Sequence, residues 1–193
     1  MDRDDRGSLG AAEIERVLGF WLDEVGPAGW YEVDEAVDRR CAGEFGGLMA
    51  NALARGCAGW QATRRGTLAL LILLDQFPRN AFRGTAGAFA GDRRARAVAK
   101  AAIAQGRDLA VPEPERQFFY LPLMHSESLA DQDRCVRLVL TRLPESGADN
   151  RHHGILHREV IRRFGRFPSR NRALGRSDTE AERAYRAAGG YMG

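Results

Sequence analysis

Residues 68–85 read LALLILLDQFPRNAFRGT, and this stretch decides the fold. Its first half is apolar on every side, which is typical of a helix that other helices enclose. Asp75 and Gln76 follow the apolar run directly, and Pro78 has no N–H and clashes with the preceding turn of a helix. The sequence therefore predicts a buried central helix that ends at Pro78 and carries a charged cluster at that end.

A second, similar turn occurs near the C-terminus. Residues 166–176 read RFPSRNRALGR, so Phe-Pro is followed closely by Arg-Asn in both stretches. Guanidinium groups bind carboxylates and phosphates through paired N–H donors, which makes a composite anion site the functional interpretation. Arginines behind a helix end also bind the free carbonyls of that helix, so a structural network is the alternative. The candidate ligand-binding residues are Asp75, Arg79, Asn80, Arg83, Arg166, Arg170 and Asn171.

The position of Asp75 predicts how the two turns are joined. Its carboxylate follows a run of large apolar side chains and is expected to be buried, where an unpaired charge is costly. Arginine is the natural partner for such a carboxylate. We therefore predict an ion pair between Asp75 and Arg166 or Arg170 of the second turn.

Histidines and glutamates supply candidate acid–base residues. His125 and Glu127 follow the turn at Pro122, and His157 precedes Glu159 on one expected helix. Histidine titrates near neutral pH, and a partly buried carboxyl group can be shifted toward it, so such pairs can exchange protons with a substrate. The candidate catalytic residues are His125, Glu127 and His157. The alternative is that these histidines are hydrogen-bonded within packed helices.

One histidine pair also has a spacing that metal sites use. His153 and His157 are four residues apart, which places two imidazoles on one face of a helix. Only Glu159 or His125 could add a ligand, and no further ligand at a defined spacing completes a motif. We therefore expect no metal and no cofactor.

The whole chain reads as helical. No stretch alternates apolar and polar residues convincingly, so we predict an all-α protein of about eight helices in antiparallel pairs, forming a single domain over residues 1–193. Asp92 is expected to cap one helix, and Ser177 with Glu180 has capping-box spacing. The expected helices cover about residues 11–25, 34–56, 68–78, 92–106, 112–122, 129–143, 149–164 and 178–188.

Composition excludes several functional classes. The chain of 193 residues has 29 basic and 26 acidic side chains, so its net charge of +3 is small, and basic and aromatic residues are not interleaved as in a nucleic-acid platform. The apolar run is far shorter than the ~20 residues that cross a bilayer, and the start MDRDDRG does not resemble a secretory signal. Cys41, Cys57 and Cys135 are widely spaced and odd in number, which indicates reduced thiols. We expect a cytoplasmic protein that binds neither membranes nor nucleic acid.

Four motifs in this order resemble a known family: LLDQFPRN, FYLPLMHSE, HREVIRRFGRFP and LGRSDTE. Together with Trp21, the pair Trp30-Tyr31 and Trp60, they resemble the bacterial family named domain of unknown function 924 over nearly the whole chain. The resemblance implies a helical fold of the tetratricopeptide-like type, a right-handed superhelix or a bundle, and no established activity. The family usually reads FPHRN in the second turn, whereas this chain has Ser169 in place of that histidine.

These observations support three hypotheses about function. The first is that an arginine-rich pocket binds a small anionic molecule or an acidic peptide terminus. The second is an enzyme, possibly a hydrolase, that uses the histidine and glutamate candidates as acid and base. The third is a scaffold that binds other proteins along its helix faces. The sequence leaves the oligomeric state open.

Overall fold

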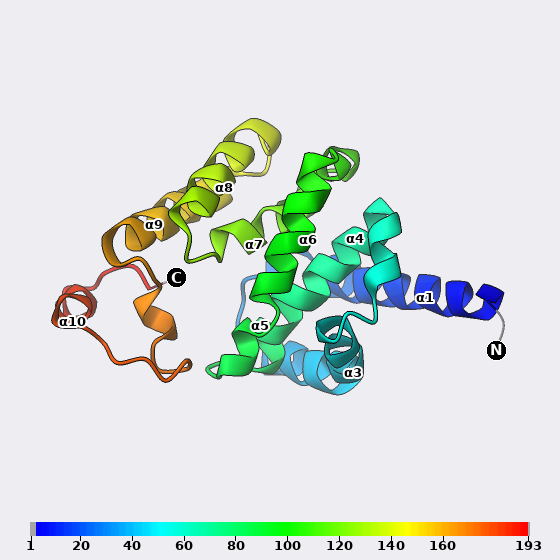
Figure 1. The fold of residues 1–193 in the computed structure, drawn as a ribbon, viewed down its shortest axis with the longest axis horizontal. Coiled ribbons are helices and arrows are strands. Elements are labelled where there is room, and N and C mark those ends of the chain that lie inside the picture. Colours follow the sequence, from blue (N-terminus) through cyan, green and yellow to red (C-terminus); the bar gives the residue numbers. More distant parts are fainter. Residues whose placement is uncertain (1–2, 193) are drawn as a thin grey trace.

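The computed structural model describes the backbone of residues 3–192 and the side chains of residues 10–192, and it confirms the all-α prediction. This part of the chain contains helices and no strand (Figure 1). Its α-helices are α1 Arg3–Leu18, α2 Gly26–Gly29, α3 Glu35–Leu53, α4 Arg64–Leu71, α5 Phe77–Ala81, α6 Asp92–Ala104, α7 Leu121–Met124, α8 Leu129–Arg142, α9 Ala148–Phe164 and α10 Glu180–Ala187. Residues 1–2, where the charged N-terminal stretch begins, lie outside the described residues.

The apolar run of residues 68–74 is the centre of the core, as its composition predicts. Each of its side chains is almost fully buried. Helices α1 and α6 pack against α4. Helix α3 packs against residues Ile72–Gln76, which follow α4. Figure 1 shows α6 crossing the middle of the molecule, with α1 on one side and the α8–α9 pair on the other. The central helix is therefore enclosed by other helices.

The prediction that the central helix ends at Pro78 is wrong. A π-helical turn, Ile72–Gln76, follows α4 without a break and leads directly into α5, where Pro78 lies in the first turn. Proline is tolerated in the first turn of an α-helix, and here that turn directly follows the π-helical turn. Turns of π-helix are rare and occur frequently at functional sites. Helix α4, the π-helical turn and α5 thus form one continuous helix, which we call the rod. It runs past Asp75 and Pro78 and ends at Ala81.

The start of α6 lies in close contact with this π-helical turn. A Cβ atom on Gly91 would be 2.0 Å from the carbonyl oxygen of Leu74, so only glycine permits this approach. Asp92 is the first residue of α6 and makes no capping hydrogen bond, contrary to the sequence prediction. Its carboxylate instead faces arginines of the two turns, as described below. The close approach at Gly91 is what carries Asp92 to that position.

Several other boundaries differ from the predicted ones. Pro122 lies in the first turn of α7 and starts that helix, whereas a helix was expected to end there. The capping box of α10 is formed by Thr179 and Glu182, two residues beyond the predicted pair. The helices α8 and α9 agree closely with the sequence prediction and lie side by side (Figure 1).

The apolar core has a large and a small part. The large part contains an aromatic cluster of Phe20, Trp21, Phe45, Phe77 and Phe118. The small part lies in the C-terminal segment, where Phe164, Tyr185 and Tyr191 pack against Val160, Ile161 and Phe167. The single domain over residues 1–193 and the tetratricopeptide-like superhelix both remain predictions.

The sequence predicts reduced thiols and an apolar run too short to cross a bilayer. The cysteines Cys41, Cys57 and Cys135 are buried and carry free thiols. Within the described residues, no helix combines the length and the apolar character that crossing a membrane requires. The cytoplasmic location remains a prediction.

Candidate functional site

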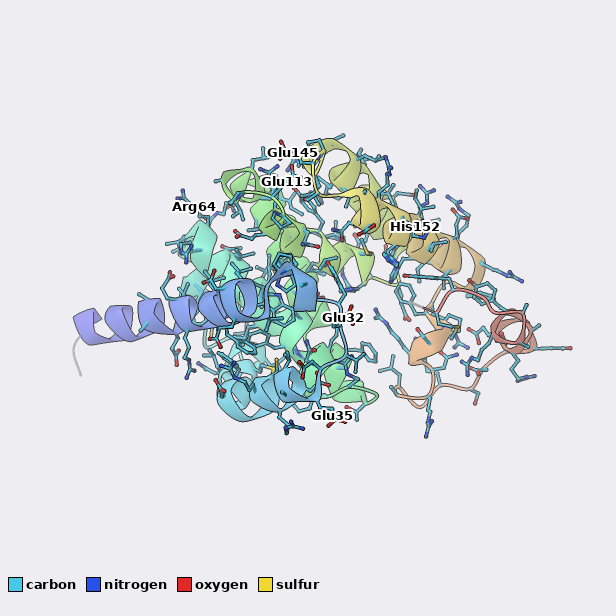
Figure 2. All side chains as sticks on the ribbon, turned by 180° about the vertical axis from the view of Figure 1, so that it is seen from behind. Glu32, Glu35, Arg64, Glu113, Glu145 and His152 are labelled. Carbon is cyan, nitrogen blue, oxygen red and sulfur yellow. The ribbon has the colours of Figure 1, made fainter. Side chains whose placement is uncertain are left out.

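The two Phe-Pro turns line one pocket of about 470 Å³, which we call the Arg170 pocket. Arg79, Asn80 and Arg83 come from the first turn, and Ser169 and Arg170 come from the second. The remaining lining residues are Trp30, Tyr31, Glu32, Gln76, Gly84, Phe89, Leu121, His125, His157, Phe167, Ala173 and Met192. Figure 2 shows Glu32 on the connector before α3, on the side toward the C-terminal segment. Two distant sequence motifs thus meet at one pocket.

Asp92 holds the two turns together. Its Oδ1 lies 2.9 Å from Nη2 of Arg79, and its Oδ2 accepts a hydrogen bond of 3.0 Å from Nη1 of Arg170. The contact with Arg79 is an attraction between charges, because it does not have hydrogen-bond geometry. A carboxylate from the start of α6 therefore bridges an arginine of each turn.

Arg170 is fixed from several directions. Its Nη2 donates to the carbonyl oxygen of His125 at 2.9 Å, and the guanidinium lies over the rings of Phe89 and Phe167, 4.7 and 4.5 Å from their centroids. Burial and the nearby Arg79 lower the pKa of Arg170, while Asp92 opposes that shift. Stacking on the two rings restricts the guanidinium to one plane. Arg170 is thus a preorganised cation in the pocket wall.

Asp75 is buried as predicted, but the predicted partner is wrong. Its carboxylate lies 2.9 and 3.0 Å from Nδ1 of His125, 2.5 Å from Nε2 of Gln76 and 3.3 Å from Nη1 of Arg79. Arg170 pairs with Asp92 instead, and Arg166 pairs with Glu182. The sequence predicts the need for a partner correctly. It does not reveal that a histidine from fifty positions away supplies the contact.

The charge state of the Asp75–His125 pair follows from its surroundings. Burial disfavours ionisation of Asp75, but Arg79, His125 and Gln76 outweigh it and hold the pKa of Asp75 at about 2. Burial and Arg79 lower the pKa of His125, although Asp75 acts in the opposite direction. An ionised carboxylate only accepts hydrogen bonds, so the neutral imidazole donates its Nδ1–H to Asp75. Nε2 of His125 is then an unprotonated acceptor.

His157 is also a neutral imidazole that carries its proton on Nδ1. Its Nδ1 lies 2.8 Å from the carbonyl oxygen of His153, so Nδ1 carries the proton and Nε2 is the acceptor. Burial and the neighbouring His125 lower the pKa of His157 to about 4. The centroids of the His125 and His157 rings are 6.4 Å apart. The Arg170 pocket therefore presents two neutral imidazoles with free acceptor nitrogens at physiological pH.

Buried polar contacts fix the turn that carries His125. Gln132 is fully buried, and its side-chain amide donates to the carbonyl oxygens of Met124 and Ser126 at 2.6 and 2.7 Å. Ser126 in turn donates its hydroxyl to Asp131 at 2.9 Å. These bonds anchor the residues on both sides of His125 to α8. The imidazole is thereby held next to Asp75.

Besides the buried Asp75, three of the candidates lie outside the lining of the Arg170 pocket. Glu127 accepts two hydrogen bonds of 2.9 Å from Arg176 and one of 2.8 Å from the backbone N–H of Phe167. Arg166 pairs with the buried Glu182 at 2.6 Å. The side chain of Asn171 donates to Glu182 and Asp178, at 3.3 and 2.7 Å. These residues hold the second turn in shape, which is the structural alternative to ligand binding.

The remaining arginine of the pocket is also paired. Arg83 donates to both oxygens of Asp38 at 2.8 and 2.9 Å and to the side chain of Asn80 at 3.0 Å. Asp38, Asp75 and Asp92 therefore balance the three arginines in the pocket wall. The exposed Glu32 also lines the pocket, so these charged groups have no excess positive charge and do not favour a multiply charged ligand.

Sequence reasoning missed the aromatic part of the pocket. Trp30 and Tyr31 lie in the connector before α3, Phe89 ends the 3-10 helix Ala86–Phe89 in the connection between α5 and α6, and Phe167 belongs to the second Phe-Pro turn. Aromatic residues in connectors are the one signal that could have been used, since core packing places most of them on helix stripes. Phe89 and Phe167 contribute by stacking on Arg170.

The His153–His157 pair does not have the arrangement that a metal site needs. His157 uses Nδ1 for the carbonyl oxygen of His153, and Nδ1 of His153 lies 2.9 Å from the hydroxyl of Tyr191. Within the described part of the chain, no group of three or more histidine, cysteine, aspartate or glutamate side chains is arranged to hold a metal ion.

Comparison with known proteins places the chain in a family of undefined function. The family model described as bacterial protein of unknown function (DUF924) matches residues 17–190. A solved structure of a protein of unknown function from Agrobacterium tumefaciens, ATU0120, is 42% identical, with a TM-score of 0.85; the match covers 92% of this chain and 98% of that one. No curated protein matches this sequence.

Proposed function

The chain belongs to the bacterial DUF924 family of unknown function, and from its pocket we propose that it binds a small monocarboxylate with an aromatic or apolar body. The carrying observation is that Arg79 and Arg170, from two distant motifs, line one pocket together with aromatic side chains. The pocket of about 470 Å³ has the size of small-molecule sites, and its lining combines aromatic side chains with polar and charged ones.

The charge balance supports a ligand with a single negative charge. Each arginine has a carboxylate partner, so the pocket lacks the excess positive charge that a phosphate ester would need. Arg79 and Arg170 nevertheless have more N–H donors than their contacts use. Those donors fit the planar oxygens of one carboxylate. The acceptor nitrogens of His125 and His157 would favour a hydroxyl group beside it.

The test is a thermal-shift series with benzoate, phenylacetate, mandelate and hexanoate, using phenylacetamide as the neutral control. At ligand concentrations about a hundred times Kd, we expect the melting temperature to rise by roughly 5 °C or more, since such binding adds about 2.7 kcal/mol. Phenylacetamide should have little effect.

A charge variant in the pocket makes the test specific. Asn80→Asp adds a negative charge to the lining and should abolish the response to carboxylates. Arg137→Gln lowers the net charge equally at an exposed position of α8 outside the pocket, and it should respond like the wild type. If no carboxylate raises the melting temperature, or if Asn80→Asp responds as strongly as Arg137→Gln, the proposal is wrong.

A second candidate is general-base catalysis, and the Asp75–His125 contact favours it. A carboxylate bonded to Nδ1 fixes the imidazole tautomer and leaves Nε2 able to take a proton, as in other histidine-dependent enzymes. Hydrolysis of an ester by an activated water molecule is the simplest reaction of this kind. General-base catalysis contributes typically 10²–10⁴-fold in rate.

This candidate is tested with a panel of aryl esters. His125→Gln should lower the hydrolysis rate by about 100-fold or more, whereas His152→Gln, an exposed histidine on α9 (Figure 2), should not change it. Because the pKa of His125 is lowered, the rate should remain high below pH 6.5. Equal rates in both variants would exclude His125 as the base.

A further inference from the structure

A second pocket, of about 450 Å³, opens between the end of α3, the 3-10 helix Ala58–Ala62 and one face of α6. We call it the Arg94 pocket, and it shares no lining residue with the Arg170 pocket. It is lined by Leu53, Arg55, Ala58, Gln61, Ala90, Arg93, Arg94, Ala97 and Val98. The four lining residues within α6 follow one helical face.

The arginines of this pocket differ in one respect from those of the Arg170 pocket. Among residues 10–192, no carboxylate forms an ion pair with Arg55, Arg93 or Arg94. In the Arg170 pocket every arginine has such a partner. Arg55 and Arg93 are exposed and Arg94 is partly exposed, so three positive charges without an ion-pair partner line one cavity and together attract an anion.

Arg94 shows the strongest sign of a missing counter-charge. Its Nη1 is buried and has no hydrogen-bond partner among the described residues. Burial lowers the pKa of the guanidinium, with Cys57 opposing and Arg55 reinforcing the shift. The side chain as a whole is partly exposed, so the rest of the guanidinium can be reached from the pocket. Because Nη1 is inaccessible to solvent, Nε and Nη2 of Arg94 are the donors available to a ligand.

Arg55 is held at the pocket by a strained backbone. Its φ of 71° is the one left-handed value at a non-glycine residue in the described chain. The residue follows the end of α3, where the N–H of Gly56 bonds to the carbonyl oxygen of Asn51 at 2.8 Å and closes the helix. Glycine is the usual residue at this position of a helix end. Keeping arginine there has a cost in stability, and strain of this kind concentrates at binding sites.

We propose that the Arg94 pocket binds the phosphate group of a small phosphorylated molecule. The three guanidinium groups come from two elements, the end of α3 and one face of α6, so they can reach oxygens that point in different directions. This arrangement suits a tetrahedral oxyanion with two charges better than a planar carboxylate. The lining has no aromatic side chain on which a nucleic-acid base could stack, which argues against single-stranded nucleic acid.

The test is isothermal titration of the intact protein with inorganic pyrophosphate at low ionic strength. The wild type should bind with a submillimolar Kd, and Arg94→Gln should weaken binding by about tenfold or more, the usual effect of losing a hydrogen bond to a charged group. Arg55→Gly should weaken binding as well, yet raise the melting temperature because it removes the strained φ. A merely structural role for Arg55 would not produce these opposite effects.

Two controls separate this site from general charge effects and from the Arg170 pocket. Arg137→Gln removes a charge from an exposed residue of α8 without an ion pair, and Asn80→Asp changes only the Arg170 pocket. Both should bind pyrophosphate like the wild type. Failure of pyrophosphate to bind, or equal binding by Arg94→Gln and Arg137→Gln, would overturn the proposal. So would succinate binding as tightly as pyrophosphate, or a short single-stranded oligonucleotide binding more tightly.

Discussion

Nδ1 of His125 lies 2.9 and 3.0 Å from the two carboxylate oxygens of Asp75. This contact joins the π-helical turn of the central rod to the residue that follows α7. Nη1 of Arg79 lies 3.3 Å from the same carboxylate, and Arg79 also contacts Asp92, which in turn binds Arg170. The polar residues of four segments therefore form one connected network beside the Arg170 pocket.

Replacing Asp75 with asparagine should destabilise the protein by about 1.5–3 kcal/mol, because the buried contacts from Nδ1 of His125 and Nη1 of Arg79 lose their charged acceptor. Urea unfolding measures this cost. The control is Asp133→Asn, whose carboxylate is half exposed and lies 3.7 Å from Arg158, and it should cost less than about 1 kcal/mol. Similar costs for the two variants would show that the Asp75 charge is not needed.

Arg79→Met and Arg170→Met should cost more together than the sum of the single variants, by about 1 kcal/mol. Either single variant leaves Asp92 with one arginine, whereas the double variant leaves its carboxylate unpaired. Each single variant also relieves the repulsion between the two arginines. Arg65→Met, whose partner is the distant Glu15, should add simply to Arg170→Met. Simple additivity of the first pair would mean that Asp92 does not couple the turns.

Gly91→Ala should destabilise the protein by about 1–3 kcal/mol or more, because its Cβ would be 2.0 Å from the carbonyl oxygen of Leu74. The rod or α6 would have to shift, which would also move Asp92. Gly47→Ala is the matched control, since a Cβ there meets nothing within 4 Å inside α3. It should stabilise the protein by up to about 1 kcal/mol. Measured melting temperatures that move in the same direction would contradict the close approach at Gly91.

Stability should fall as the pH decreases from about 6.5 to about 4. The pKa of His157 is lowered to about 4 in the folded protein, and that of His125 is lowered as well, so the unfolded chain binds protons first in this range. The slope is at most ~1.4 kcal/mol per pH unit for each histidine. His157→Gln should flatten the curve of melting temperature against pH, and His152→Gln should leave it unchanged. A curve that His157→Gln does not alter would contradict this account.

The sequence predicts the parts of the site that depend on local pattern. The apolar run of residues 68–74 identifies the buried rod, and the repeated Phe-Pro and Arg-Asn elements identify the turns that line the Arg170 pocket. Glu127 and Arg166 stand out in the sequence in the same way. Their side chains, however, stabilise the second turn and do not line the Arg170 pocket. Charge and spacing alone do not separate a pocket-lining arginine from one that is paired elsewhere.

The remaining features depend on contacts between distant segments. Asp92 has the pattern of a helix cap, but the close approach at Gly91 places its carboxylate between Arg79 and Arg170. The π-helical turn carries the rod through Pro78, which local propensity predicts as a stop. His125 reaches Asp75 because α7 packs against α6 and α8, and α8 anchors the turn that carries His125. No local pattern contains this information.

The central claim is that a small carboxylate binds among the two turns, His125 and His157. The most direct measurement is nitrogen-15 NMR of the imidazoles in protein labelled at its 4 histidines, during titration with phenylacetate and mandelate. The account predicts that the Nε2 signals of His125 and His157 shift with saturation, while those of His152 stay in place. Signals of His125 and His157 that do not move, or that move no more than those of His152, would contradict it.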